Sequence, residues 1–238
     1  MVNAFLDIFR SKEVSHEGID PDAPISAARF VVLDTELTGL DQRRDSLISI
    51  GAFRMTGGAI EVGTYFDRMM NPEREMNPKS VVIHGVTPSE VQNEPATKPI
   101  LAESWSYCKD AILVGHCIDV DMFYLNKELR VLHGRELSNP VVDTYSLYEW
   151  LVGKGILRPQ KASGGASTAL FAIAADLGIS AAAAHNALSD AYTTAQIFQR
   201  FLSFFRREGI TTIGALLRIG DPAGGGTRAL PAGQVSIF

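Results

Sequence analysis

The sequence predicts an α/β fold, a mixed five-stranded sheet flanked by helices, and two observations support this fold class. Three stretches of high β-propensity come first, at residues 30–34, 47–55 and 59–69. Two short apolar stretches follow at residues 111–115 and 141–142, and each comes after a segment with helical character. Strands joined directly form an antiparallel meander, whereas strands joined through helices lie parallel. We therefore expect an antiparallel meander of three strands plus two parallel strands.

The first half of the chain supplies the meander. Residues 30–34 (FVVLD) are almost wholly apolar, which is typical of a buried strand. The TGG sequence at residues 56–58 is a hairpin signal between the second and third strands. A capping box with proline at the first helical position, residues 87–90 (TPSE), indicates that a helix begins there. Before the sheet, residues 1–28 form a polar leader in which we expect a loose helix and a linker.

The second half is expected to alternate helices and strands. Helices at residues 100–110 and 122–132 flank the strand at 111–115, and Asp143 caps a helix that ends near residue 151. A connection rich in Gly, Lys and Ser leads to two closing helices and then to a C-terminal extension. The expected bounds are 153–165 for the connection, 168–177 and 187–205 for the closing helices, 210–219 for a short helix and 220–226 for a flexible linker. This divides the chain into a leader (1–28), a domain (29–205) and an extension (206–238).

The composition fits one globular domain. Of 238 residues, 46% are hydrophobic and 21% charged, which is enough to build a core. The formal net charge of −5 argues against a broadly basic surface that coats nucleic acid, although metal ions and local Lys or Arg could supply a positive field. Cys108 and Cys117 form neither a disulfide framework nor a zinc pattern, and we find no signal peptide or membrane span. These features favour a cytoplasmic protein.

Four acidic side chains in three separated segments carry the chemical signal. Asp34 and Glu36 end the first strand two residues apart, so both side chains face the same side of it. Asp121 follows the strand at 111–115, and Asp190 lies five residues after His185. Gathered carboxylates repel one another unless cations lie between them, and oxygen ligands favour Mg²⁺ or Mn²⁺ over zinc. With a histidine beside them, these acids indicate two-metal hydrolysis of a phosphodiester.

Some of these positions have competing interpretations. Asp119 could take the place of Asp121, but the position of Asp121 relative to the FYL sequence that follows favours Asp121 as the ligand. We interpret His116 as a strand-end histidine that holds its loop by hydrogen bonds. For His185 and Asp190 taken alone, a loop histidine and an acid at a helix N-terminus explain the pair equally well.

Taken together, the segments resemble the DnaQ-like 3′→5′ exonucleases of the DEDDh type. Residues 34–40 (DTELTGL) are similar to the family motif DxETTGL, residues 115–125 to HNxxFDxxFL, and residues 185–190 (HNALSD) to HxAxxD. Residues 83–87 (IHGVT) and 142–144 (VDT) match two further landmarks in the right order. The resemblance covers roughly residues 29–205 and implies a ribonuclease H-like fold. Within the family, the pattern of motifs is similar to that of the epsilon proofreading subunits of bacterial DNA polymerase III.

The resemblance implies a role for each matched residue. Asp34, Glu36, Asp121 and Asp190 would bind two divalent ions, Mg²⁺ or Mn²⁺. His185 would be the general base that deprotonates the attacking water, while one ion lowers the pKa of that water and the other stabilises the departing 3′ oxygen. The implied activity is release of 5′-mononucleotides from 3′ ends of DNA, single-stranded ends above all, in proofreading or repair.

The turn after the first strand is expected to contact the substrate. The resemblance implies that the backbone and side chain at Thr38 contact the terminal nucleotide and that Leu40 packs against its base. A tight turn at these positions would also expose backbone N–H groups to a phosphate or a sugar hydroxyl. The expected substrate-binding residues are Thr35, Leu37, Thr38, Gly39 and Leu40.

Three positions depart from the family pattern. Leu37 stands where the family usually has Thr, Cys117 where it has Asn, and Val120 where it has Phe. None of these changes removes a metal ligand or the base, so they bear on efficiency and substrate preference rather than on the general chemistry.

The last five residues, 234–238 (QVSIF), resemble the QxxLF-type peptide by which bacterial polymerases and repair enzymes bind the sliding clamp. Gln234, Ile237 and Phe238 would make that contact, and an accidental match that folds back on the domain is the alternative. An RNA 3′-end-trimming exoribonuclease with the same chemistry stays open. So does a catalytically silent module that binds a clamp or a polymerase, although no acid or base of the pattern is missing.

Overall fold

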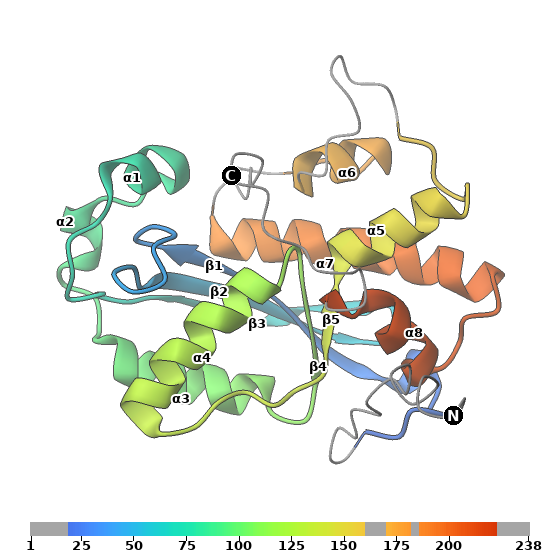
Figure 1. The fold of residues 1–238 in the computed structure, drawn as a ribbon, viewed down its shortest axis with the longest axis horizontal. Coiled ribbons are helices and arrows are strands. Elements are labelled where there is room, and N and C mark those ends of the chain that lie inside the picture. Colours follow the sequence, from blue (N-terminus) through green and yellow to red (C-terminus); the bar gives the residue numbers. More distant parts are fainter. Residues whose placement is uncertain (1–18, 160–169, 182–185, 223–238) are drawn as a thin grey trace, which may run out of the picture.

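A five-stranded mixed sheet forms the centre of the computed structural model, which describes residues 19–159, 170–181 and 186–222 (Figure 1). The strand order is β3-β2-β1-β4-β5. Antiparallel pairing joins β1 to β2 and β2 to β3, whereas β4 lies parallel to β1 and β5 parallel to β4. This is the predicted meander followed by two parallel strands. The bounds are β1 (Arg29–Leu37), β2 (Leu47–Thr56), β3 (Ala59–Met69), β4 (Ile112–Gly115) and β5 (Val141–Asp143).

Helices cover both faces of the sheet (Figure 1). One face packs against α5, α6, α7 and α8, and the other against α3 and α4. Two short helices, α1 and α2, follow β3, and a 3-10 turn at Ile25–Ala27 precedes β1. The bounds are α1 (Pro78–His84), α2 (Pro88–Val91), α3 (Thr97–Cys108), α4 (Asp119–His133), α5 (Thr144–Gly153), α6 (Leu170–Asp176), α7 (Ala187–Arg207) and α8 (Ile213–Gly220).

Strand β1 changes from apolar to acidic along its length. Its first residues alternate between the two core clusters, with Phe30 and Val32 on the side of α7 and Leu33 on the side of α3 and α4. Because side chains alternate along a strand, Asp34 and Glu36 continue the row of Phe30 and Val32. The two acids therefore end the strand on the face that α7 covers.

Helix α7 is the longest helix that the structure describes, and it anchors the core. Asn186 caps it by accepting a hydrogen bond from the amide of Ser189 at 3.1 Å. Phe198, Phe201 and Phe205 are fully buried against the sheet, and each contributes about 2–3 kcal/mol by leaving water. This packing fixes the helix, and with it the acid in its first turn.

Several helices differ from the sequence-based prediction, and α8 is one of them, since it begins at residue 213 rather than 210. The structure adds α1, which Asn77 caps through the amide of Lys79 at 3.0 Å, with proline at the first position. The helix expected to begin at residues 87–90 is present as α2, capped by Thr87 and four residues long. The next helix, α3, begins at residue 97 rather than 100. Helix α4 begins at residue 119 rather than 122, so Asp121 lies inside its first turn and not in the preceding loop.

The core extends past residues 29–205 on both sides. Ile25 and Ala28 belong to the same cluster as Phe30, and so do Ile213 and Leu216 of α8. The amide of Ile25 also donates a hydrogen bond to the carbonyl of Thr211 at 2.8 Å. The end of the expected leader and the start of the expected extension thus pack together on the face of the sheet that α7 covers.

Several sequence-based predictions concern residues outside the described ranges. These are the helix within residues 1–18, residues 160–165 of the connection at 153–165, the first two residues of the helix at 168–177, and residues 223–226 of the linker at 220–226. The division of the chain into leader, domain and extension stays a prediction. Within the described residues, every helix is too short or too polar to span a membrane.

Candidate active site

Three acidic side chains meet at the carboxyl end of β1. Asp34, Glu36 and Asp190 each offer a carboxylate oxygen, and these oxygens lie within 4.8 Å of one another. The first two come from β1 and the third from the first turn of α7. Glu36 is 5% exposed and Asp190 7% exposed. The structure thus brings together acids that are more than 150 residues apart in the chain.

Asp121 lies beside this cluster rather than within it. It stands in the first turn of α4, is buried, and accepts a hydrogen bond from the Thr35 hydroxyl at 2.7 Å through Oδ1. Thr35 lies between Asp34 and Glu36 in β1, so this hydrogen bond holds Asp121 against the strand that carries both acids. Asp119, the competing acid, is exposed. The burial pattern therefore favours Asp121 over Asp119, as the sequence suggested.

Burial and the charges of neighbouring acids raise the pKa values of Asp34, Glu36 and Asp121. Loss of water raises the pKa of Asp34 well above its usual range, and the charges of Asp121, Glu36 and Asp190 raise it further. Burial, followed by the charges of Asp190 and Asp121, raises the pKa of Glu36 to about 8. The pKa of Asp121 is raised to about 7 by burial, against the opposing effect of the Thr35 hydrogen bond. Without cations the cluster therefore holds protons, and full ionisation requires positive charge.

The donor set fits a divalent cation. The three clustered residues present carboxylate oxygens and no nitrogen or sulfur, which is the ligand type that Mg²⁺ and Mn²⁺ prefer. A cation among these oxygens would replace the repulsion between them with attraction.

A glycine in β2 lets α7 reach the site. Gly51 pairs with Asp34 across the sheet, and a Cβ at this position would lie 2.2 Å from the amide nitrogen of Leu188 and 2.4 Å from the carbonyl oxygen of Ala187. Only glycine permits the first turn of α7 to lie directly on the sheet here, and this contact places Asp190 beside Asp34. Gly51 was not among the predicted site residues, although a glycine in the interior of a strand signals close backbone approach.

The turn after β1 is more enclosed than the sequence suggested. Thr38 is fully buried; its amide donates to the carbonyl of Ser46 at 2.9 Å, and its hydroxyl donates to Asp45 Oδ1 at 2.8 Å. The exposed N–H group expected at Thr38 is therefore paired within the turn. Leu37 is buried in the core and Gly39 is also buried, whereas Leu40 is 43% exposed. Of the five expected substrate-binding residues, Leu40 has the most accessible side chain.

The loop after β4 is held by β5 and α5. The Nδ1 atom of His116 lies 3.1 Å from the Thr144 hydroxyl, and the amide of Cys117 donates to Asp143 Oδ1 at 2.8 Å. Asp143 also caps α5 by accepting from the amides of Tyr145 and Ser146. His116 and Asp143 thus do what the sequence predicted for each. Cys117 has φ +56°, in the left-handed region that favours Gly and Asn.

A cavity of about 360 Å³ adjoins the cluster at Glu36. This volume falls in the range of small-molecule pockets. It lies between β2, β3, α3 and the start of α7, and Arg68 on its wall pairs with Glu103 at 3.0 Å. The wall includes Glu36, Ser49, Asp67, Arg68, Val86, Ile100, Glu103 and Asn186.

The remaining predicted site residues lie outside the described ranges. These are His185, the expected general base, and the clamp-binding residues Gln234, Ile237 and Phe238. Their roles stay predictions.

The buried carboxylates at the end of β1 agree with the metal site that the motif resemblance implied. The chain matches the RNase_T family model, described as exonuclease, over residues 31–198. The protein therefore belongs to this exonuclease family, and the resemblance to DnaQ-like exonucleases inferred from its motifs is confirmed.

Its relatives include bacterial replication proteins. A PolC-type DNA polymerase III from Thermotoga maritima is 30% identical over 203 residues, which are 85% of this chain and 14% of that protein. An epsilon-like protein from Rhodobacter capsulatus is 34% identical over 82% of this chain and 27% of its own length. The epsilon subunit of Aquifex aeolicus is 29% identical over 73% of this chain and 80% of its own length. The chain thus spans well under a third of the first two proteins.

Solved structures share the fold. Exonuclease I from E. coli, in complex with a dT13 oligonucleotide, superposes with a TM-score of 0.67 at 17% identity over 76% of this chain and 42% of that chain. Exonuclease I from Methylocaldum szegediense gives a TM-score of 0.62 at 20% identity over 76% of this chain and 43% of that chain. These neighbours confirm the ribonuclease H-like fold.

Proposed function

We propose that the protein is a divalent-metal-dependent 3′→5′ exonuclease that releases 5′-mononucleotides from single-stranded DNA ends. The observation that carries this proposal is the buried cluster of Asp34, Glu36 and Asp190 in a member of an exonuclease family. Burial and the charges of neighbouring acids raise the pKa values of Asp34 and Glu36, so cations among the carboxylates would favour the ionised forms near neutral pH.

The proposed ligands are positioned by three parts of the fold. Asp34 and Glu36 are fixed by the pairing of β1 with β2, and Asp190 by the packing of α7 over Gly51. Asp121 is oriented by the hydroxyl of Thr35 and would complete the ligand set. When bound, two Mg²⁺ or Mn²⁺ ions lower the pKa of a water molecule and neutralise charge on the departing 3′ oxygen.

His185 is proposed as the general base. A histidine with a pKa near its ordinary value of about 6.5 can accept a proton from water at neutral pH. In the sequence it directly precedes Asn186, the cap of α7, and lies five residues before Asp190.

DNA is the proposed substrate. A solved neighbour is in complex with a dT13 oligonucleotide, and the relatives are named as DNA polymerase III proteins. The exposed side chain of Leu40 and the cavity beside Glu36 offer apolar and polar surface next to the acids, where a terminal nucleotide could lie. RNA 3′-end trimming is the alternative, and matched DNA and RNA oligonucleotides of one sequence distinguish the two.

The test is a nuclease assay with oligonucleotides labelled at the 5′ end, in Mg²⁺, in Mn²⁺ and in chelator. We expect stepwise shortening from the 3′ end that stops in chelator and at a 3′-terminal phosphorothioate linkage. Asp34→Asn and Asp190→Asn should each lower the rate by at least about a hundredfold, since each removes charge that the reaction needs. Asp119→Asn is the matched control, because this exposed acid stands two residues from Asp121, and it should cut at the normal rate. Shortening that persists in chelator or in Asp34→Asn contradicts the proposal.

We also propose that residues 234–238 bind a sliding clamp. The support is the QVSIF sequence, in which Ile237 and Phe238 could enter an apolar groove of a partner. Removing these five residues should leave cleavage of short oligonucleotides unchanged and abolish co-elution with the clamp. Ser236→Ala is the control, and co-elution that survives the truncation ends this hypothesis.

A further inference from the structure

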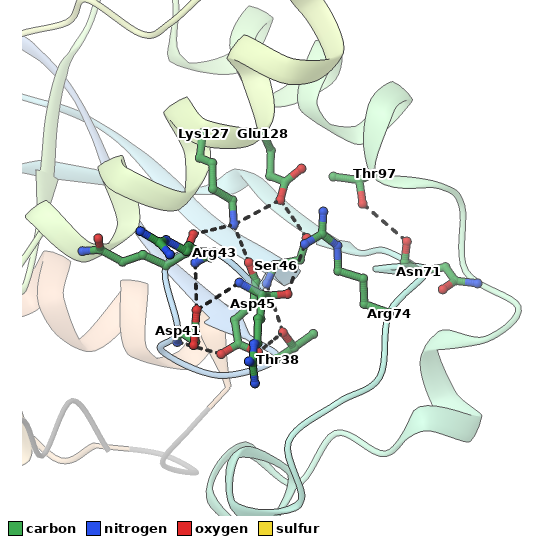
Figure 2. A network of polar contacts seen from close by, with 12 residues as sticks. Thr38, Asp41, Arg43, Asp45, Ser46, Asn71, Arg74, Thr97, Lys127 and Glu128 are labelled. Carbon is green, nitrogen blue, oxygen red and sulfur yellow. Dashed lines mark hydrogen bonds and ion pairs between the residues drawn. The ribbon is translucent and has the colours of Figure 1, made fainter.

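A second cluster of polar side chains ties the β1–β2 loop, residues 38–46, to helix α4 (Figure 2). The loop begins directly after β1, the strand that carries Asp34 and Glu36, and it includes the exposed Leu40. Contacts within the loop and contacts from α4 together fix its course.

Asp45 organises the inside of the loop. Its carboxylate is buried; Oδ1 accepts from the Thr38 hydroxyl at 2.8 Å, and Oδ2 accepts from the Asp41 amide at 2.7 Å. A Cβ at Gly39 would lie 2.4 Å from Oδ2, so the carboxylate occupies the space that a side chain at position 39 would need. One carboxylate therefore fixes the start of the turn and the residue that follows Leu40.

Two neighbouring residues of α4 hold the loop from outside. Lys127 donates hydrogen bonds to the backbone carbonyls of Asp45 and Gln42. Glu128 is buried and accepts from the Ser46 hydroxyl at 2.9 Å, and it lies 3.6 Å from the Lys127 ammonium group. Figure 2 shows both side chains pointing from the helix toward the loop.

The same helix is tied to β1 at its other end. Asp121, in the first turn of α4, accepts the hydrogen bond from Thr35 of β1. Lys127 stands six positions after Asp121 in the helix, a rise of about 9 Å along its axis. Hydrogen bonds thus connect α4 to β1 through Asp121 and to the β1–β2 loop through Lys127 and Glu128.

We propose that Asp45 is a positioning residue, which holds the turn at residues 38–40 in place for substrate, with Lys127 and Glu128 as its anchors on α4. The inference rests on the proposed function, since it concerns how the nuclease site binds the end of its strand. Loss of the carboxylate would leave the Thr38 hydroxyl and the Asp41 amide without acceptors, and the turn would adopt other conformations. The acids at Asp34, Glu36 and Asp190 are positioned by other contacts, so metal binding and chemistry should persist.

Two substitutions at one position separate positioning from general stability. Asp45→Ala removes both acceptors. Asp45→Asn can keep both pairings: its amide oxygen accepts from the Asp41 amide, and its amide nitrogen donates to the Thr38 hydroxyl, which reverses the direction of that hydrogen bond. Asn139→Ala is the matched control: the Asn139 side chain makes two hydrogen bonds, of 2.9 and 2.8 Å, to the carbonyls of Cys108 and Ala111, away from the site.

The assay measures kcat and KM on a short single-stranded DNA, with melting temperatures recorded in parallel. We expect Asp45→Ala to raise KM by about tenfold, the effect of losing one hydrogen bond to a charged group, with kcat within about threefold of wild type. Asp45→Asn should restore KM, and Asn139→Ala should lower the melting temperature without changing KM. If Asp45→Ala does not fold, Lys127→Met takes its place, with an expected KM rise of about three- to tenfold.

The outcomes distinguish the inference from the function on which it rests. A wild-type protein without nuclease activity contradicts the proposed function and the inference with it. An active wild type, together with an Asp45→Ala variant whose KM is unchanged, overturns the inference alone. An Asp45→Asn variant as impaired as Asp45→Ala overturns it as well, and so does a KM rise of equal size in Asn139→Ala.

Discussion

Glu36→Gln should stabilise the metal-free protein at alkaline pH. The substitution keeps the shape of the side chain and removes a charge that is buried beside Asp34, Asp121 and Asp190. A shift in the pKa of Glu36 from 4.5 to about 8 corresponds to about 5 kcal/mol of unfavourable interaction with the ionised form. Because the neighbouring acids share protons with it, we expect a gain of about 2–4 kcal/mol at pH 8. For a chain of this size that is a rise in melting temperature of roughly 5–15 °C.

The direction of the pH dependence follows from the raised pKa. Between pH 4.5 and about 8 the folded protein keeps a proton on Glu36 that the unfolded chain has already lost. The unfolded state binds fewer protons in this window, so the free energy of unfolding falls as pH rises through it. At pH 5 Glu36 is still protonated in the folded protein, and the gain from Gln should fall below about 1 kcal/mol.

The measurement is thermal or urea unfolding of wild type and Glu36→Gln, in chelator, at pH 5 and pH 8. The comparison at pH 5 is the internal control, because it shares every effect of the substitution except the charge. Equal stabilities at pH 8, or a gain of the same size at both values, would refute the argument that burial and the charges of neighbouring acids disfavour the ionised form of Glu36.

Three further outcomes are expected. Excess Mn²⁺ should raise the melting temperature of the wild type more at pH 8 than at pH 5, and an equal rise would contradict metal binding by ionised carboxylates. Gly51→Ala should lower the free energy of unfolding by about 1–3 kcal/mol and the nuclease rate by at least about tenfold, because its Cβ would push the first turn of α7 from the sheet. The control is Gly58→Ala, whose Cβ meets no described atom within 4 Å, and it should match wild type in both assays. Cys117→Gly should raise the free energy of unfolding by up to about 1 kcal/mol, because glycine adopts the left-handed backbone conformation at this position without strain. A lower melting temperature of the variant would show that the cysteine side chain stabilises the fold by more than this strain costs.

The strands and most of the helices could be predicted because local signals agree with the tertiary structure there. The alternation of Phe30, Val32, Asp34 and Glu36 gives both the burial of β1 and the shared direction of its acids. The hairpin at residues 56–58 fixed the meander in the same way. Helix α1 carries such a signal too, since Asn77 followed by proline is a helix start, and it could have been predicted from it.

Other features depend on contacts that no local pattern reveals. Asp41 and Asp45 flank two arginines in a charged stretch that resembles a solvated loop, yet Asp45 is buried because Gly39 leaves room for its carboxylate. The early start of α4 follows from the left-handed Cys117, which turns the chain into the helix two residues later. The pairing of the Thr38 hydroxyl with Asp45 likewise became visible only in three dimensions.

Helix α7 contributes both to the core and to the acidic site, so formation of the site depends on packing of the core. Asp190 stands on the same helix as Phe198, Phe201 and Phe205, whose rings fill the space beneath the sheet. A chain in which the five strands have formed but α7 has not yet packed lacks Asp190 at the site. Asp190 reaches Asp34 and Glu36 only when the aromatic side chains of α7 pack against the core. If Asp190 is a metal ligand as proposed, the ligand set is complete only when α7 has packed on the sheet, and nuclease activity would then depend on the finished core.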